Sequence, residues 1–145
     1  MQAETVDEGA GKELQVTIPL VCIPIALAII YLSKIPVAKA MAKQPEGYDN
    51  RHPRDQQAKL SGWGKRALAA HMNGFEAFPA FAAGVLVAHV GHADPKWSTI
   101  LAVGFVVART IYPMMYIANV DKARSGVWFL GLCCSMGLMI LPCLS

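Results

Sequence analysis

The sequence is poor in charge for its length. Of its 145 residues, 16% are Asp, Glu, Lys or Arg, whereas about 25% is usual for a soluble domain. Strict alternation of apolar and polar residues is also missing, which argues against β-strands and a β-barrel. No internal repeat or low-complexity tract is evident. These absences argue against a soluble domain, a repeat protein and a disordered chain.

Metal-binding patterns are missing as well. Adjacent cysteines do not have the C-x-x-C spacing of a zinc site, so we interpret the cysteines as small apolar fillers of helices. The histidines are too scattered along the chain to predict a shared metal ion. We therefore predict no metal. The residues concerned are Cys22, Cys133, Cys134, Cys143, His52, His71, His89 and His92.

Two further classes are disfavoured by the distribution of charge. The net charge of +3 comes from connecting loops, and no separate basic domain exists, so we predict no nucleic-acid partner. Residues 1–13 are acidic, the opposite of the basic start of a secretory signal. We therefore expect no cleavable signal peptide and a first apolar segment that is kept.

Long apolar blocks dominate what is present. Hydrophobic residues make up 54% of the chain, and the mean hydropathy is +0.38. A membrane span needs ~20 mostly apolar residues and must be helical to satisfy its backbone. We predict an all-α membrane protein, a four-transmembrane-helix bundle forming one domain over residues 1–145. The expected spans are about 14–41, 65–90, 95–118 and 124–144.

Basic residues gather on one side of these spans. Ten lie in or beside the first and third connections, against Lys12 and Lys96 on the other side. Since cytoplasmic loops carry the excess of Lys and Arg, we predict that loops 42–64 and 119–124 are cytoplasmic and that both termini lie opposite. The ten are Lys34, Lys39, Lys43, Arg51, Arg54, Lys59, Lys65, Arg66, Lys122 and Arg124.

Polar residues interrupt two of the spans. Asn73 and Glu76 lie in the second span and Arg109 in the third. A charge at the bilayer centre costs at least ~2.5–3.5 kcal/mol, so such residues usually face a partner or a wet cavity. At 1.5 Å per residue, Glu76 and Arg109 both lie roughly 15 Å from the cytoplasmic ends of their helices. We predict an ion pair or hydrogen-bonded contact between them, in a common pocket opening toward the cytoplasm.

Further polar side chains lead from this pair to the surface. Tyr112 and Tyr116 share the helix face of Arg109, and Arg124 begins the last span beside Ser125. Such a wall could hold a small anionic, amine-bearing molecule, and Arg124 at a helix N-terminus could stabilise an anion such as a thiolate. Two simpler interpretations stay open: the buried pair only locks helices together, and Arg124 only flanks a span.

The motifs resemble those of the MAPEG family, the membrane-associated proteins of eicosanoid and glutathione metabolism. They are Asn73-x-x-Glu76-x-x-Pro79, then Arg109-x-x-Tyr112-x-x-x-Tyr116, then Arg124-Ser125. The resemblance covers about residues 15–145, and HMNGFEAFPAF is its most specific string. The segment YDNRHPRDQQAKLSGWGKRA is similar to the bacterial branch, which favours a bacterial inner membrane.

The resemblance implies a homotrimer that binds glutathione as a co-substrate between neighbouring subunits. It implies thiolate attack on a lipophilic electrophile, or reduction of a hydroperoxide, with the second substrate arriving through the membrane lipids. Arg124 would stabilise the thiolate, with Ser125 beside it as the second predicted catalytic residue. The predicted substrate-binding residues are Asn73, Glu76, Arg109, Tyr112 and Tyr116.

Two departures from the family pattern keep other functions open. Ala69 stands where the eukaryotic synthases have an arginine, and Ala77 where the leukotriene-type enzymes have a tyrosine; Arg66 or Lys39 could compensate. The alternative to a glutathione transferase or peroxidase is a non-catalytic membrane module that binds a lipid, a small ligand or a partner protein. A small transporter or channel is a third hypothesis.

Overall fold

A computed structural model describes residues 16–144 of the chain. The acidic segment 1–13, on which we based the expectation that the first apolar segment is kept, lies outside these residues. Within the described range all regular structure is helical, in agreement with the predicted class. The elements are α1 (Ile18–Leu32), α2 (Lys34–Ala42), α3 (Pro53–Ala58), α4 (Gly62–Val90), α5 (Pro95–Ile117), α6 (Asp121–Ile140) and a closing 3-10 turn, η1 (Leu141–Leu144).

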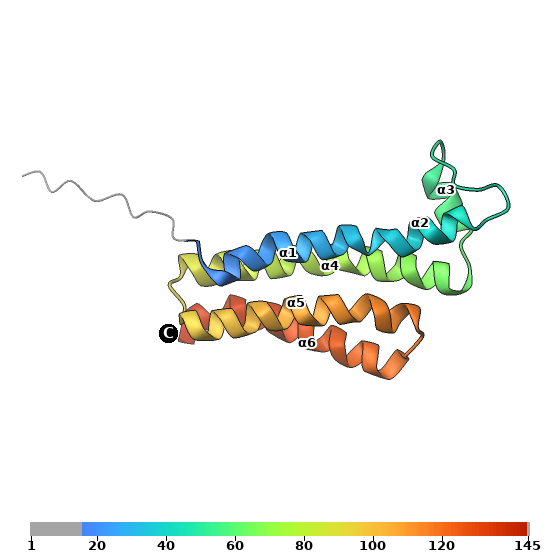
Figure 1. Ribbon diagram of the computed structural model, residues 1–145. Helices are drawn as coiled ribbons and strands as arrows, with labels where there is room; N and C mark the ends of the chain where they lie inside the picture. The colour runs from blue at the N-terminus through green and yellow to red at the C-terminus, as the bar shows by residue number, and fades with distance from the viewer. Residues whose placement is uncertain (1–15, 145) are drawn as a thin grey trace, which may run out of the picture.

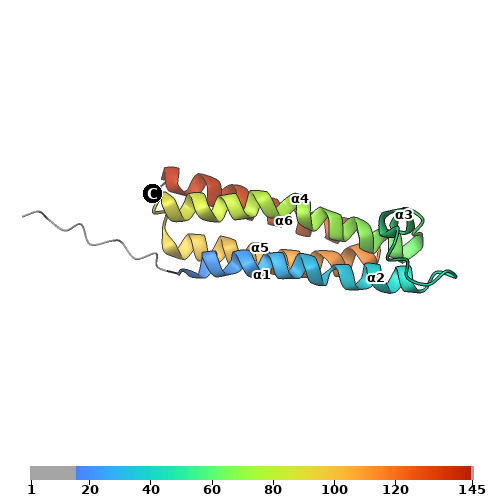
Figure 2. The ribbon, with the colours of Figure 1, turned by 90° about the horizontal axis from the view of Figure 1, so that it is seen from above.

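The long helices lie side by side, as Figures 1 and 2 show from two directions. Helix α1 packs against α4 and α5, and α6 packs against the same two helices. The α2–α4 and α5–α6 connections lie together at the end that carries α3, whereas the α4–α5 connection and the C-terminus lie at the other (Figure 1). The two loops that we predict to be cytoplasmic therefore share one end of the molecule.

Within residues 16–144, three segments are long and apolar enough to cross a membrane. They are Ile18–Ala42, Pro95–Ile117 and Asp121–Leu144. Helix α4 is the longest helix, with 29 residues, but it is not among these candidate spans. Its composition explains this, because small residues and the polar Asn73 and Glu76 replace the larger apolar side chains of the other helices.

The first predicted span is one apolar stretch but two helices. Helix α1 ends at Leu32 and α2 begins at Lys34, two residues before Pro36. A proline ring clashes with the carbonyl four residues earlier and cannot donate to it, which accounts for a break at Ser33. Side chains bind the backbone beside this break: the Ser33 hydroxyl donates to the Ile30 carbonyl at 2.6 Å. Nδ1 of His71, from α4, lies 3.0 Å from that same carbonyl.

Close packing holds α4 to its neighbours in the half of the molecule away from α3. The Phe81 and Phe105 rings stack with centroids 3.9 Å apart, and both side chains are fully or almost fully buried. A Cβ atom on Gly84 would lie 2.8 Å from the Ser135 carbonyl oxygen of α6. Small residues allow membrane helices to approach this closely. Apolar contacts of α4 also continue on the other side of the polar residues, where Ala67 packs with Val37 and Met41 of α2.

Candidate functional site

A line of hydrogen bonds joins α5 to α4 at the polar residues. The Arg109 side chain is 7% exposed, and its Nη1 donates to the side-chain oxygen of Asn73 at 2.9 Å. The Asn73 amide nitrogen in turn donates to Oε2 of Glu76 at 3.0 Å. The side-chain amide of Asn73 thus accepts from Arg109 through its oxygen and donates to Glu76 through its nitrogen, so it connects the arginine to the carboxylate.

The predicted contact between Glu76 and Arg109 is therefore indirect. Within residues 16–144 no carboxylate oxygen lies within 4.0 Å of the Arg109 nitrogens. Glu76 is also exposed on the protomer rather than buried as we expected. Glu76 lies three residues beyond Asn73, roughly 60° further round a helix of 3.6 residues per turn, and from there its carboxylate reaches the Asn73 amide. Its carboxylate can consequently accept a cation that approaches from outside the protomer.

The surroundings of Arg109 include groups that the sequence did not indicate. Its guanidinium lies 5.5 Å from the centre of the Phe105 ring and 5.1 Å from that of Tyr112. A Cβ atom on Gly131, in α6, would lie 3.6 Å from Arg109 Nε, so a bulky side chain there would displace the guanidinium. Nε itself is buried without a hydrogen-bond partner. Spacing along α5 could have suggested Phe105, four residues before Arg109, but nothing in the sequence pairs Gly131 with it.

The tyrosines continue the polar line toward the end that carries α3. The rings of Tyr112 and Tyr116 meet edge to face at 5.7 Å between centroids. The Arg124 guanidinium carbon, from α6, lies 4.3 Å from the centre of the Tyr116 ring. Cation–π contact of this kind holds a guanidinium plane in place while leaving its N–H groups free to donate. The structure thus brings Arg124 to the predicted tyrosines.

Ser125 lies beside Arg124 but is already engaged. Its hydroxyl donates to the Asp121 carbonyl at 3.0 Å, one turn earlier in α6, and the residue is exposed. A hydroxyl in this arrangement presents its lone pairs outward, so it would have to rotate before donating to an anion. Of the predicted site residues, Ser125 is therefore the least prepared for its expected role.

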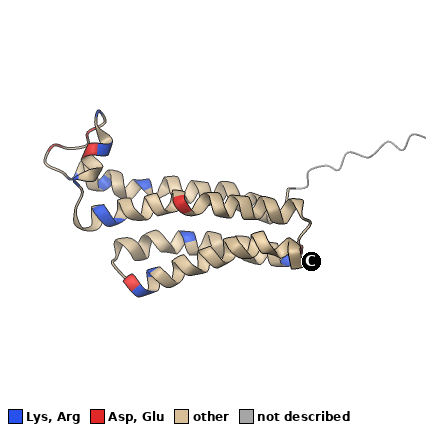
Figure 3. Cartoon of the chain, turned by 180° about the vertical axis from the view of Figure 1, so that it is seen from behind, with Lys and Arg blue, Asp and Glu red and all other residues tan. Residues whose placement is uncertain are grey.

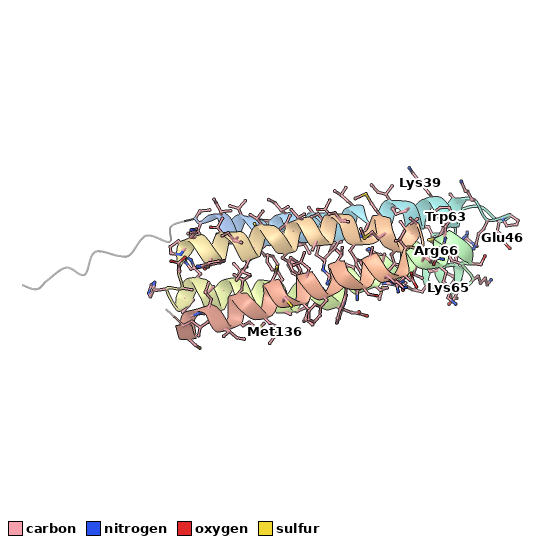
Figure 4. All side chains as sticks on the ribbon, turned by 90° about the horizontal axis from the view of Figure 1, so that it is seen from below. Lys39, Glu46, Trp63, Lys65, Arg66 and Met136 are labelled. Carbon is pink, nitrogen blue, oxygen red and sulfur yellow. The ribbon has the colours of Figure 1, made fainter. Side chains whose placement is uncertain are left out.

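The two candidates for compensating Ala69 differ in position. Arg66 lies seven residues before Asn73, on the same face of α4, and its Nε donates to the Ile117 carbonyl at the end of α5 at 3.0 Å. Lys39, on α2, is exposed. Figure 4 shows both at the end that carries α3, with Arg66 closer to the middle of the bundle. Arg66 thus lies where α4 meets α5 and is held there by its hydrogen bond to Ile117.

Metal-ligand residues, thiols and an apolar cavity complete the description of residues 16–144. No three His, Cys, Asp or Glu residues lie together as metal ligands there. Cys22 and Cys134 are buried, Cys133 and Cys143 are exposed, and all four are free thiols. One apolar cavity of about 360 Å³ lies between the start of α1 and α5, at the end away from α3. Its lining includes Val21, Cys22, Val103 and Val106.

The comparison with protein families identifies the chain. A sequence model described as the MAPEG family matches residues 18–144, so this chain belongs to that family and is a membrane protein of the eicosanoid and glutathione metabolism group. No curated protein matches the chain. No solved structure matches it.

Proposed function

We propose that this MAPEG family member is an integral membrane enzyme that uses glutathione as a co-substrate, either to conjugate lipophilic electrophiles or to reduce hydroperoxides. The observation that carries the proposal is the connected series of Glu76, Asn73 and Arg109, followed by Tyr112, Tyr116 and Arg124. It leads from the middle of α4 toward the end that carries α3. If these residues served only to hold α4 and α5 together, Glu76, Asn73 and Arg109 would be sufficient.

The chemical types along this series match the groups of glutathione. The exposed Glu76 carboxylate suits the ammonium of the γ-glutamyl group, since it lacks a cation partner in residues 16–144. Arg66 offers guanidinium N–H groups beyond the Nε that is bound to Ile117, and these suit a carboxylate. The hydroxyls of Tyr112 and Tyr116 suit peptide carbonyls. Arg66 would then take the place of the arginine that the eukaryotic synthases have at position 69.

Arg124 would stabilise the thiolate. It is half-buried and lies in the first turn of α6, which runs from Asp121 to Ile140. A cation and the positive end of a helix both favour the ionised form of a nearby thiol. In conjugation, the thiol loses its proton to water, sulfur bonds to the electrophilic carbon and the leaving group departs with its electron pair. In hydroperoxide reduction, two thiols become one disulfide, and the products are an alcohol and water.

The open character of the site supports a homotrimer. Glu76 and Ser125 are exposed, and Asn73 and Arg124 are only partly covered, so one protomer does not enclose a ligand. Large apolar residues such as Phe129 and Leu130, on α6, are exposed too. A neighbouring protomer and membrane lipid would cover such surfaces. We also propose that α4 crosses the membrane as a fourth span, in a bacterial inner membrane with the α3 end cytoplasmic.

Glutathione binding and turnover of the purified protein test this proposal. In detergent, we expect calorimetry to show glutathione binding and a chlorodinitrobenzene-type electrophile to be conjugated. Arg124→Ala should greatly weaken conjugation. Lys122→Ala is the matched control, because Lys122 is an exposed cation in the same helical turn. Absence of both binding and turnover would reject the enzyme.

A non-catalytic module is the second candidate, and the apolar cavity between α1 and α5 favours it. Its walls are almost entirely aliphatic, and it opens on a segment long and apolar enough to lie in the membrane. An acyl chain fits such a surface without any of the polar residues on α4. Lipid retained by protein that binds no glutathione would support this candidate over the enzyme.

A further inference from the structure

Exposed cations surround the end of the molecule that carries α3. Figure 3 shows Lys and Arg gathered there, whereas Lys96 is the only one at the opposite end of residues 16–144. In Figure 4, Lys39 and Lys65 lie on opposite sides of this end, with Trp63 between them. We name five of the exposed cations of this end the cationic collar: Lys39, Lys43, Arg54, Lys59 and Lys65; Arg51 and Lys122 are exposed there too.

The cations of the collar form no ion pairs with the acids of their own segment in the part of the chain that the structure describes. None of its five cations has a carboxylate within 4.0 Å among residues 16–144, although Glu46, Asp49 and Asp55 lie in the same stretch. Asp49 is engaged elsewhere: its Oδ1 accepts the backbone N–H groups of Arg51 at 2.7 Å and His52 at 3.1 Å. The segment thus uses this carboxylate to fold its own backbone and leaves the positive charges available.

A buried glutamine holds the segment in place. Gln56 is 5% exposed; its amide nitrogen donates to the carbonyls of Met41 and Gly47, and its oxygen accepts the backbone N–H of Asp49 at 3.0 Å. Beside it, the Arg54 guanidinium donates to Gln57 Oε1 at 3.4 Å. The cations are therefore displayed by a folded segment that is anchored to the end of α2.

The residue types around the collar identify its partner. Lys43 Nζ lies 5.5 Å from the centre of the Trp63 ring, and Trp63 is 37% exposed. Tryptophan is enriched at the headgroup level of membranes, and clustered Lys and Arg beside membrane helices attract acidic lipids. We propose that the cationic collar binds the phosphate headgroups of anionic phospholipids in the leaflet at the α3 end. This proposal does not depend on glutathione binding.

Lipid selectivity of the purified protein tests the proposal. The protein is reconstituted in nanodiscs with equal phosphatidylglycerol and phosphatidylcholine, and the lipids that it retains are counted by native mass spectrometry. The test variant combines Lys43→Gln, Arg54→Gln and Lys59→Gln, none of which belongs to the proposed glutathione site. We expect the native protein to retain phosphatidylglycerol several-fold over phosphatidylcholine, the triple variant to lose most of this preference, and added salt to weaken it.

Lys96→Gln is the matched control, since it removes an exposed cation from the opposite end and should leave the preference unchanged. A native protein that retains both lipids equally would overturn the proposal, and so would a triple variant with native selectivity. Displacement of phosphatidylglycerol by inorganic phosphate at low concentration would indicate a site for a free anion instead. If circular dichroism shows the triple variant to be unfolded, the three single variants are compared, and each should lower the preference in part.

Discussion

The guanidinium of Arg109 donates to the side-chain oxygen of Asn73 across 2.9 Å, and a neutral amide, not a carboxylate, thus receives the most buried charge on α5. The negative charge lies one hydrogen bond further, on Glu76. Nη1 of Arg109 thus has a hydrogen-bond acceptor inside the protomer, while the Glu76 carboxylate stays at the surface. The same three residues therefore join two helices and present an anionic group outward.

Asn73→Ala should destabilise the protein. The substitution leaves Nη1 of Arg109 without its acceptor in a buried position, and a lost hydrogen bond to a charged group costs about 2 kcal/mol. Thermal unfolding in detergent would measure the loss, with Asn50→Ala, an exposed amide in the α2–α3 connection, as the control. Equal stability of the two variants would show that the Arg109–Asn73 bond contributes nothing net.

Gly84→Ala should also destabilise, through a different mechanism. The added Cβ would lie 2.8 Å from the Ser135 carbonyl oxygen and 3.1 Å from Leu138 Cβ, which forces α6 away from α4 at about 1–3 kcal/mol. Gly126→Ala is the matched control, because its Cβ would meet nothing within 4 Å and alanine is better than glycine inside a helix by about 0.5–1 kcal/mol. The two variants should shift the unfolding temperature in opposite directions; a shift of the same sign would contradict this packing.

Arg124→Gln should weaken ionisation of the bound thiol. Because the cation and the helix N-terminus both favour the thiolate, removal of the cation should raise the apparent pKa of bound glutathione by about one unit, a tenfold loss of thiolate at neutral pH. Ultraviolet absorbance of the thiolate against pH measures this directly. Lys122→Gln should leave the titration unchanged. An unaltered curve for the Arg124 variant would remove this residue from the chemistry.

The α2–α3 connection should open on acidification. Backbone N–H groups of Arg51 and His52 stabilise the ionised Asp49 carboxylate and hold its pKa below the ordinary value of 3.8. A lowered pKa contributes stability that is complete above the ordinary value and is lost as the pH falls through the lowered one. The protection of the Arg51 and His52 amides against hydrogen exchange, relative to the intrinsic exchange rate at each pH, should therefore fall below about pH 3.8. Asp49→Asn should flatten this dependence, whereas Glu46→Gln should keep it.

Much of the fold was predictable from apolar length alone. The residues of α5 and α6 match their predicted spans to within a few positions, because an apolar run of this length with so few charges has few alternatives to a helix. The break at Ser33 was less predictable, since it depends on Pro36 together with a histidine from α4. Prolines at Pro24, Pro79 and Pro113 lie inside continuous helices, so a proline alone does not mark a break.

The candidate site was predictable by residue but not by geometry. Helical spacing grouped Tyr112 and Tyr116 with Arg109, and their rings do continue from it. The indirect link through Asn73 was not foreseeable, because helical spacing places Asn73 and Glu76 on one side of α4 and does not tell which of the two meets Arg109. Contacts between distant segments, such as Gly131 with Arg109, carry no periodic signal at all.

The polar composition of α4 has a consequence for how the chain enters a bilayer. Helix α4 carries Glu76 and is not apolar enough to count among the candidate spans, so placing it alone in a bilayer is costly. Its counter-charge, Arg109, is made later, on α5, and only residues 91–94 separate the two helices. We therefore expect α4 and α5 to insert together as one helical hairpin, so that the insertion of α4 depends on the synthesis of α5.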